Sequence, residues 1–521
     1  LPGVTAEMGE VRVYPYAGAF AHVIGYVAKI NADDLKKMNE KPDRVYLHPG
    51  FRIGKQGVEK ALDQDLRGVA GEQKVEVDAR GRVVRMYPQG DIEPVPGKEV
   101  VLTLDADVQN RALEVFGEES GAAVVMDCRT GDLICMASAP SFDANKFVRG
   151  LSGAEFRALN TFERTPLLDK AMSGVYPPGS TFKPTTALAL LEAGIDPHDR
   201  VVCTGGYYYG GRTFRCWKPG GHGAQDMRDA IKNSCDVYFY HMCNRAGIDT
   251  IAKTARALGY HSTFDIGIGG QKRGLIPDTD WKRKTFKNDP VWHPGETLSV
   301  AIGQGAVTAN ALQMAVAVSR IANGQKAIVP RLIKSIGGRE SPSGAEVPDL
   351  PFSKEHLQIV REGMAAVAND PTGTAYRQSQ LGLGEVKMAG KTGTAQVRSF
   401  DKGGRSSVGV TWRLKDHNLF TAFAPYDNPR YALAVIVQHG GMGGATAGAP
   451  RAREIMRMVL LKDPEIRARV ENPTPLPPVE PTIEGEIEGA DPGLPIATPV
   501  APADPLAPML QPPAPTPVEP Q

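Results

Sequence analysis

The stretch SGVYPPGSTFKP, from Ser173 to Pro184, places a serine and a lysine three residues apart, directly after a Pro-Pro-Gly that cannot continue a helix. The following segment, TTALALLEAG, contains good helix formers with apolar spacing, and Gly194 marks its end. We therefore expect Ser180 at the N-terminus of a buried helix. Lys183 should lie on the same face, because residues at i and i+3 of a helix are neighbours.

This serine and lysine pair suits nucleophilic catalysis. A serine hydroxyl becomes a good nucleophile when a base removes its proton, and a lysine can be that base when burial or positive charge lowers its pKa. A helix N-terminus adds partial positive charge and free N–H groups for an oxyanion. Ser-x-x-Lys alone also fits a capping serine beside a solvated lysine, so the interpretation depends on other motifs.

Two further motifs follow in the chain. Ser234-Cys235-Asp236 comes after the helix-like MRDAIKN, and Lys391-Thr392-Gly393-Thr394 begins an alternating, strand-like segment. Ser-x-x-Lys, Ser-Asp-Asn and Lys-Thr-Gly, in this order, are motifs of serine acyl transferases that react with β-lactams. Three matches in the same order indicate one active site rather than three coincidences.

The composition is that of a globular chain. Its 521 residues are 41% hydrophobic, enough for two or three folded domains, and 60 basic against 59 acidic residues give no reason to expect nucleic acid as a partner. No apolar run approaches the roughly 20 residues that cross a bilayer. Because the chain begins at Leu1 without a leader, we expect a processed form or a piece of a longer protein.

The order of predicted elements gives the domain organisation. Short apolar segments broken by Gly and Pro predict a small α+β module, and a breaker-rich stretch at 88–100 predicts its boundary. After a helix capped by Asp105, a hairpin near 121–138 and later strands near 391, 419–424 and 431–437 predict an α+β domain with an antiparallel sheet flanked by helices. We place the domains at 1–96 and 97–465.

A tail at 466–521 completes this organisation. From 471 onward it contains 16 prolines and no lysine or arginine, so it has little to bury. We therefore expect the tail to be disordered.

The motifs carry a family resemblance. The chain from about Tyr14 to Met458 resembles the class B penicillin-binding proteins. The blocks that carry the resemblance are YPYAGAFAHVIGYVAKIN, GKQGVEKALDQDLRG, LTLDADVQ, VAIGQG and AGKTGTAQV. The chain is most similar to their elongation-type branch, penicillin-binding protein 2. The resemblance implies the penicillin-binding transpeptidase fold and part of an N-terminal pedestal module of the dimerisation type.

The same resemblance implies an activity and a setting. It implies a D,D-transpeptidase that cross-links peptidoglycan stem peptides during cell elongation and is a target of β-lactam antibiotics. It also implies the periplasmic face of the bacterial inner membrane, and as partners the lipid-linked glycan, a RodA-type glycan polymerase and the elongation machinery. No organic cofactor and no nucleic acid are expected.

Roles for individual residues also come from the resemblance. Ser180 would attack the D-Ala-D-Ala carbonyl with Lys183 as base, and Ser234 would relay a proton to the leaving amine. Lys391, Thr392 and Thr394, around Gly393, would bind the donor carboxylate, and the N–H groups of Ser180 and Thr394 would form the oxyanion hole. Lys391 would also add positive charge that keeps Lys183 neutral. Asp236 stands where many relatives have Asn, which fits the elongation-type branch but leaves its role open.

Four residues between the first and third motifs have a metal-like spacing: Cys203-x12-Cys216-x5-His222-x12-Cys235. Three thiols and one imidazole are the ligand set of a closed, structural zinc site, and some relatives of penicillin-binding protein 2 have a mixed-ligand zinc site in this loop. A Cys203–Cys216 disulfide and buried free thiols remain alternatives, because the short Cys-x-x-Cys of typical zinc motifs is missing. We assign no chemistry to Cys128, Cys135 or Cys243.

Two other functions remain possible for this fold. A carboxypeptidase or β-lactamase would hydrolyse its acyl-enzyme, and a non-catalytic β-lactam sensor would only bind. A β-lactamase has no need of the N-terminal module, and no deacylating base is identifiable in the sequence. These observations favour the transpeptidase.

Overall fold

The computed structural model describes residues 11–37, 50–397, 409–441 and 443–472. All described residues belong to one compact unit. In the described part of the chain, no helix is both long enough and apolar enough to span a bilayer.

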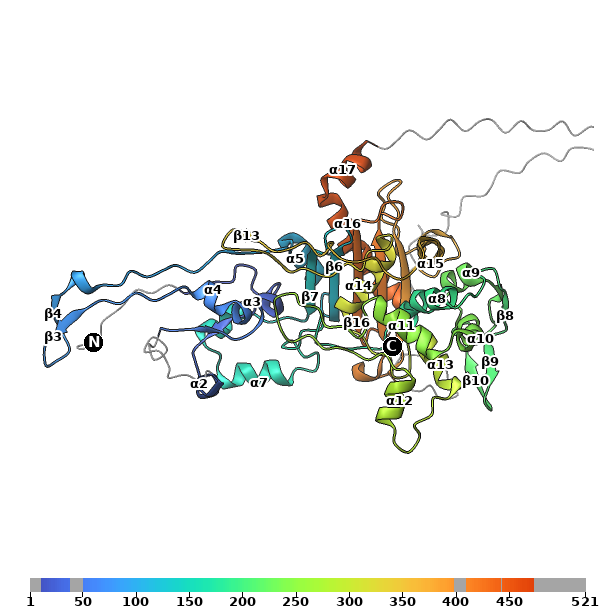
Figure 1. Ribbon diagram of the computed structural model, residues 1–521, viewed down its shortest axis with the longest axis horizontal. Coiled ribbons are helices and arrows are strands. Elements are labelled where there is room, and N and C mark those ends of the chain that lie inside the picture. Colours follow the sequence, from blue (N-terminus) through green and yellow to red (C-terminus); the bar gives the residue numbers. More distant parts are fainter. Residues whose placement is uncertain (1–10, 38–49, 398–408, 442, 473–521) are drawn as a thin grey trace, which may run out of the picture. The chain divides into compact units, whose positions relative to one another are not determined.

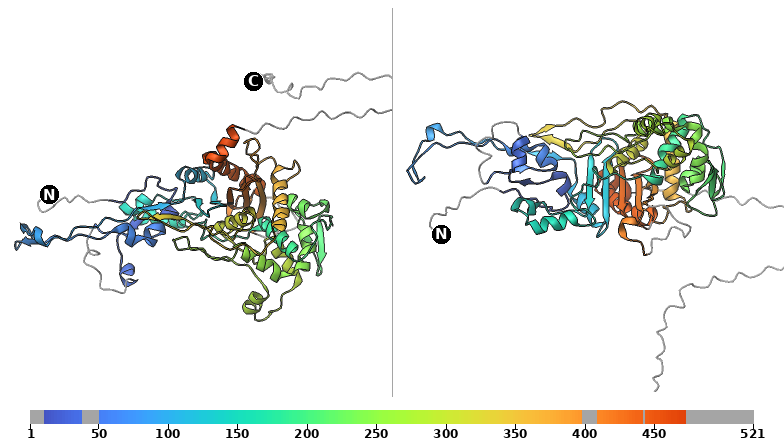
Figure 2. Two further views of the ribbon diagram at one scale, coloured as in Figure 1. Left: turned by 45° about the horizontal axis from the view of Figure 1, so that its top comes forward. Right: turned by 90° about the horizontal axis from the view of Figure 1, so that it is seen from below.

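A five-stranded antiparallel sheet, in the order β14-β15-β16-β6-β7, forms the centre of the large domain (Figure 1). Its strands are β6 (Ser120–Asp127), β7 (Leu133–Ala139), β14 (Ala389–Ala395), β15 (His417–Ala424) and β16 (Tyr431–Gln438). β6 pairs with β16 along its whole length, so the start of the domain lies beside its end (Figure 2). The predicted α+β class and hairpin are confirmed.

Helices cover both faces of this sheet, because every residue of β6 and β15 is buried. α14 (Ala311–Ala322) packs on β6, β15 and β16, while α16 (Gly444–Lys462) packs on β14, β15 and β16, and α5 (Ala106–Glu114) packs on β7. Asp105 caps α5, as predicted, by accepting from the N–H groups of Asp107 and Val108.

A helical layer and two small two-stranded sheets lie beyond the β14 edge. Its helices are α8 (Lys183–Glu192), α9 (Met227–Lys232), α10 (Asp236–Ala246), α11 (Ile248–Ala257), α12 (Thr279–Thr285), α13 (Pro294–Ala301) and α15 (Lys354–Asn369). Its paired strands are β8 (Val201–Cys203) with β11 (Gly223–Gln225), and β9 (Gly206–Tyr209) with β10 (Arg212–Arg215). α15 contacts both β14 and α9, which joins this layer to the sheet.

The N-terminal module is built from small elements. They are α1 (Ala21–Ile24), β1 (Val27–Ala28), α2 (Ala32–Lys37), β2 (Ile53–Gly54), α3 (Gly57–Ala61), α4 (Asp63–Arg67), β3 (Val75–Val77) and β4 (Val83–Met86). Its buried residues Tyr14 and Val27 share one cluster with Phe142 and Val148. The helix α6 (Ala144–Arg149) therefore completes the core of this module, although it follows the boundary placed at 96.

The remaining elements join the parts of the unit. β5 (Val100–Leu102) pairs with β12 (Ile333–Ile336), which also pairs with β13 (Arg339–Glu340); α7 (Gly153–Thr161) follows α6. At the other end, α17 (Pro464–Glu471) runs across the boundary placed at 465, and its Ile466 is buried. The first residues of the predicted tail are thus helical, and from 473 onward the tail lies outside the described residues.

Candidate active site

Ser180 lies in a 3₁₀ turn, Gly179–Phe182, that leads directly into α8. Lys183 is the first residue of α8 and is fully buried, whereas Ser180 is half-buried. The turn approaches the third motif closely: Gly179 has φ +53°, and a Cβ there would lie 2.5 Å from Thr394 O. Pro184 is tolerated because it occupies the first helical turn, where its missing N–H is not needed.

The amine of Lys183 joins the first two motifs. Its Nζ lies 2.7 Å from Asp236 Oδ1, 2.7 Å from Ser234 O and 3.2 Å from Ser234 Oγ. Asp236 is the first residue of α10, so this ion pair ties the start of one helix to the start of another. Motifs 51 to 53 residues apart in the chain thus meet at one atom.

Ser234 adopts a conformation that L-residues rarely occupy. Its φ is +52°, and it lies in the short connection between α9 and α10. The flanking backbone is fixed by two hydrogen bonds, from Ser234 N to Ile231 O at 3.2 Å and from Cys235 N to Ala230 O at 2.9 Å. Such strain persists only where the surroundings enforce it, and it is typical of functional sites.

Trp217 positions the second motif, and sequence reasoning missed it. Its backbone N–H donates to Asp236 Oδ2 at 3.0 Å, and its indole Nε1 donates to Asn233 O at 3.0 Å. Asp236 is therefore held through both carboxylate oxygens, one by Lys183 and one by this N–H. The available signal was its position directly after Cys216, in the loop with metal-like spacing.

The third motif occupies β14, the edge strand of the sheet. Because side chains alternate along a strand, Thr392 and Thr394 face the side opposite to Lys391. Lys391 Nζ is fully buried and lies 3.0 Å from Thr392 O and 3.5 Å from Thr392 Oγ1. Gly393 leaves room for the active-site turn, since a Cβ there would lie 3.1 Å from Pro178 O.

Two more polar residues, also missed, support this strand. Gln304 Nε2 donates to Thr394 O at 3.1 Å, and the hydroxyls of Thr374 and Thr392 are hydrogen-bonded at 3.1 Å. The sequence did carry signals for both. Gln304 belongs to the VAIGQG block, and Thr374 lies in PTGTAY, which repeats four letters of KTGTAQ.

The two buried lysines differ in their electrostatic support. Burial lowers the pKa of Lys391 well below its usual value and the nearby Lys183 lowers it further, while Asp236 acts in the opposite direction. Lys183 has the carboxylate of Asp236 at 2.7 Å. The resemblance implied that Lys391 adds positive charge that keeps Lys183 neutral. In the structure, burial and the nearby Lys183 disfavour the charge on Lys391, and the Lys183 amine lies beside the Asp236 carboxylate.

The Cys and His residues with metal-like spacing form one cluster. The ligand atoms of Cys203, Cys216, His222 and Cys235 all lie within 4.8 Å of one another, and all six cysteines, each of them described, are free thiols. His222 Nδ1 lies 3.6 Å from the Sγ atoms of both Cys203 and Cys216. The geometry therefore disfavours the disulfide alternative.

These positions can be compared with those of zinc ligands. A tetrahedral zinc ion at about 2.3 Å from sulfur and about 2.1 Å from nitrogen holds those two atoms roughly 3.6 Å apart. The backbone also fits, because Gly221 has φ +75° and a Cβ there would lie 2.1 Å from Cys203 O. The four residues fit a structural zinc ion.

Comparison with known proteins gives the family. The model of the penicillin binding protein transpeptidase domain matches residues 121–457, and that of the penicillin-binding protein dimerisation domain matches residues 1–102. The chain belongs to the PBP2-type penicillin-binding proteins. It is 35% identical over 480 residues to peptidoglycan D,D-transpeptidase MrdA of Escherichia coli K12, covering 91% of this chain and 75% of that protein.

Solved PBP2 structures agree with this assignment. Pseudomonas aeruginosa PBP2, in complex with WCK 5153, has a TM-score of 0.73 and 32% identity, covering 88% of this chain and 93% of that one. Helicobacter pylori PBP2, in complex with MreC, has a TM-score of 0.74 and 31% identity, covering 86% and 79%. This PBP2-type chain is a peptidoglycan D,D-transpeptidase, a serine-type acyl transferase of cell-wall synthesis.

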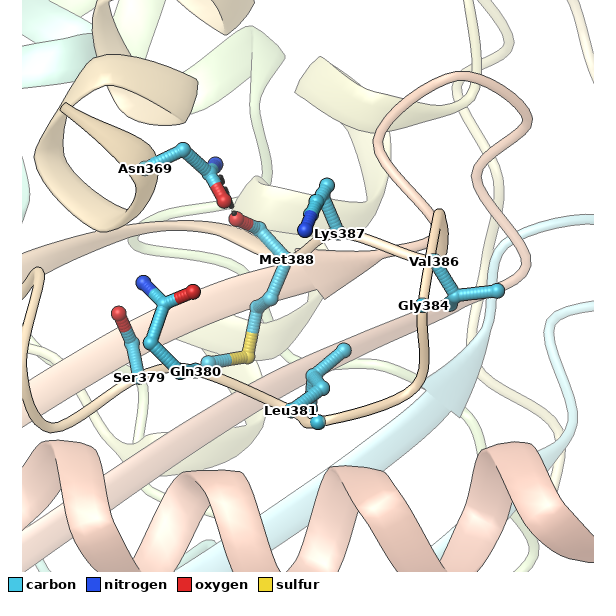
Figure 3. A pocket seen from close by; sticks show the side chains of 9 residues that line it. Asn369, Ser379, Gln380, Leu381, Gly384, Val386, Lys387 and Met388 are labelled. Atoms are coloured by element: carbon cyan, nitrogen blue, oxygen red, sulfur yellow. Dashed lines mark hydrogen bonds between the residues drawn. The ribbon is translucent and has the colours of Figure 1, made fainter. Parts of the chain in front are cut away.

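A cavity of about 240 Å³ lies away from the catalytic groups of this PBP2-type chain (Figure 3). It lies between the end of α15 and the residues that precede β14, and Asn369 Nδ2 donates to Met388 O at its wall, 2.9 Å away. None of the motif residues lines it. We therefore assign the chemistry to the motif cluster and not to this cavity.

Proposed function

We propose that Ser180 is the nucleophile of this peptidoglycan D,D-transpeptidase. The observation that carries the proposal is the buried Lys183 amine, which lies one turn from Ser180 and contacts both Ser234 and Asp236. Ser180 Oγ bonds to the D-Ala-D-Ala carbonyl carbon of a stem peptide, the C–N bond breaks, and D-Ala leaves. An amine of a second stem peptide then displaces Ser180, which regains its proton.

Lys183, Ser234 and Asp236 move protons in these steps. Lys183 accepts the Ser180 proton as a neutral amine, and Asp236 stabilises the ammonium group until that proton passes through Ser234 to the leaving amine. Ser234 Oγ, 3.2 Å from Lys183 Nζ, is placed to relay a proton to the leaving amine. The N–H of Trp217 keeps Asp236 aimed at Lys183.

The β14 edge binds the donor peptide. An edge strand has unpaired N–H and C=O groups that can pair with an extended peptide. Thr392 and Thr394 would bind the terminal carboxylate of that peptide, with Gly393 allowing the close approach of the active-site turn. The N–H groups of Ser180 and Thr394 would bind the oxyanion, and Lys391 would support Thr392 from below.

Labelling with a fluorescent penicillin tests this assignment. We expect the wild-type chain to form a stable acyl-enzyme that loses its label slowly, and Ser180→Ala to remain unlabelled. Fast loss of the label would favour a β-lactamase or carboxypeptidase. Labelling without cross-linking of stem peptides would favour a β-lactam sensor, and labelling of Ser180→Ala would refute the nucleophile.

We further propose that Cys203, Cys216, His222 and Cys235 hold a structural zinc ion. Four protein ligands leave no position for water or substrate, so the ion would hold the loop and take no part in the reaction. Cys235 lies between Ser234 and Asp236, and Cys216 precedes Trp217, so the cluster is next to the active site at two points. Elemental analysis should find one zinc per chain, and a folded, active, zinc-free protein would contradict the proposal.

We also propose where and with what the enzyme works. Its substrates, stem peptides on a lipid-linked glycan, place it at the periplasmic face of the bacterial inner membrane. The MreC complex of the Helicobacter pylori relative supports a place in the elongation machinery, where a RodA-type polymerase would supply new glycan. Reconstitution with such a polymerase should raise the cross-linking rate, and an unchanged rate would contradict the partnership.

A further inference from the structure

The β9–β10 hairpin beside the active site has two unlike faces. On one face, Tyr207 stacks on Tyr240 of α10 with ring centroids 6.4 Å apart and planes 26° apart, and Phe214 lies 5.6 Å from the same ring. Phe214 is directly opposite Tyr207 in the strand register, so the two share this face. This face anchors the hairpin on α10, the helix that begins at Asp236.

The opposite face of the hairpin is open. Tyr208 and Thr213 are directly opposite each other there, and Tyr208 is 71% exposed. Arg215 is on the same face, opposite Gly206, and is also exposed. A tyrosine this exposed on an anchored strand keeps its ring available as a flat contact surface for a partner.

The segment that carries this face is basic. From 200 to 225 it contains no Asp or Glu, and its basic side chains are all exposed: Arg200, Arg212, Arg215 and Lys218. Within the described residues, none of these four forms an ion pair, although Arg212 lies over the Phe214 ring at 4.2 Å. The surface therefore has uncompensated positive charge, which favours an anionic partner.

Trp217 connects this surface to the catalytic groups. Trp217 is 42% exposed, and its indole is fixed by the hydrogen bond from Nε1 to the carbonyl of Asn233, the residue before Ser234. Its backbone N–H holds Asp236. An exposed, oriented aromatic ring thus lies at the point where the basic hairpin segment meets the active site.

We propose that Tyr208, Arg215, Trp217 and Lys218 form a subsite for an uncross-linked peptidoglycan strand. The rings of Tyr208 and Trp217 offer flat apolar faces for sugar rings, and Arg215 and Lys218 offer donors to the free carboxylates of the stem peptides. The inference rests on the proposed function, because it places the remainder of the donor or acceptor strand on the hairpin while one stem enters the cleft. A protein partner on this face is the competing outcome.

The test measures the binding of peptidoglycan strands while Ser180 is blocked. The chain is first acylated at Ser180 with penicillin, and the binding of soluble, uncross-linked strands with intact pentapeptide stems is then measured by fluorescence anisotropy. We expect Tyr208→Ala and Arg215→Glu each to weaken binding at least about fivefold. Arg339→Glu, at an exposed arginine of β13, is the matched control and should leave the affinity unchanged.

Two further arms identify what is bound. Strands stripped of their stem peptides should bind more weakly than intact strands, and binding of intact strands should weaken as salt is raised from 50 to 200 mM. Equal affinity of wild type and both variants, or equal affinity for stripped and intact strands, would overturn the subsite. Fluorescent-penicillin labelling should be unchanged in both variants, so a failure of the subsite is distinguishable from failure of the proposed function, which would show as absent labelling of the wild type.

Discussion

The candidate active site has a helical side, which contains Lys183, and a sheet side, which contains Lys391, and the two buried lysines differ in their polar partners. On the helical side, the fully buried Lys183 has a carboxylate, a hydroxyl and a carbonyl within 3.2 Å. On the sheet side, Lys391 is equally buried and its pKa is lowered, and among the described residues its amine hydrogen-bonds only to the carbonyl and hydroxyl of Thr392. Two lysines with the same burial therefore have different partners, and we infer that they have different roles in the reaction.

This difference separates proton transfer from substrate binding. On the helical side, the Lys183 amine contacts both Ser234 and Asp236, and we propose that it transfers protons there. On the sheet side, burial disfavours the charge on Lys391, and we propose that backbone N–H groups and threonine hydroxyls bind the substrate there. Breaking each side separately should give distinct defects.

The largest effect is expected from removal of the nucleophile. Ser180→Ala removes the only oxygen that we propose to form the acyl bond, so cross-linking should fall on the order of 10⁶-fold. A stem-peptide cross-linking assay measures this loss. Acylation by fluorescent penicillin, followed by mass spectrometry of the modified peptide, shows which serine is acylated. Ser173→Ala, in the same stretch but hydrogen-bonded to Gly270 O, is the control and should keep acylation near that of wild type.

Removal of the proposed base should have the next largest effect. Lys183→Met keeps an unbranched apolar side chain and removes the amine, and loss of a general base typically costs about 10²–10⁴-fold in rate. Lys170→Met is the matched control, because Lys170 is also fully buried but donates to Thr165 O outside the cleft. A lower melting temperature with normal acylation is expected for the control. Equal loss in both variants would mean that Lys183 acts through stability alone.

The sequence predicted part of the helical side of the active site and missed the rest. Ser180 and Lys183 could be related from local rules, because a proline-glycine start and i, i+3 spacing fix their geometry. The same rules could not place Trp217, whose N–H reaches Asp236 only through the fold of the loop, nor the left-handed Ser234, whose strain is enforced by neighbours. The spacing of three cysteines and one histidine predicted the cluster, but only the structure shows that their ligand atoms lie within 4.8 Å of one another.

Local sequence rules also could not predict the strand pairing on the sheet side or the domain boundaries. Apolar runs predicted β15 and β16, and Lys-Thr-Gly marked β14, but pairing of β16 with β6 is set by contacts between distant segments. Likewise α6 joins the N-terminal core although its sequence follows the hairpin of the large domain. Local composition fixes where an element forms, whereas packing against distant residues decides which domain it completes.

Disturbing the Cys and His cluster should weaken the helical side without removing any group that reacts. Cys203→Ser should lower zinc content and melting temperature and reduce acylation about tenfold, because Ser234 and Asp236 lose support from Cys235 and the adjoining loop. Cys243→Ser is the matched control, since Cys243 is buried on α10 outside the cluster and contacts Tyr240 O. Elemental analysis and penicillin acylation of both variants measure the effect. Wild-type acylation in a zinc-free Cys203→Ser protein would show that the cluster does not position Ser234.

The smallest expected effect concerns the neutral sheet side, through His417 at the start of β15. His417 pairs with Ala395 at the end of β14, and its Nδ1 accepts from the N–H of His439 at 3.0 Å. Burial, with a contribution from His439, lowers the pKa of His417 to about 3. In an unfolded chain the pKa of histidine is about 6.5, so the unfolded state binds the proton more readily between these values and the free energy of unfolding falls as pH falls from about 6.5 towards 3.

At pH 5 this single group should cost roughly 2 kcal/mol of the free energy of unfolding relative to neutral pH. His417→Gln should therefore lose less stability between pH 7 and pH 5 than wild type, as measured by urea unfolding at each pH. The pKa of His439 is also lowered by burial, so part of the pH dependence should remain in the variant. His198→Gln, at an exposed histidine, is the control and should follow the wild-type slope. An unchanged slope in His417→Gln would mean that the sheet side is not kept neutral by burial of this residue.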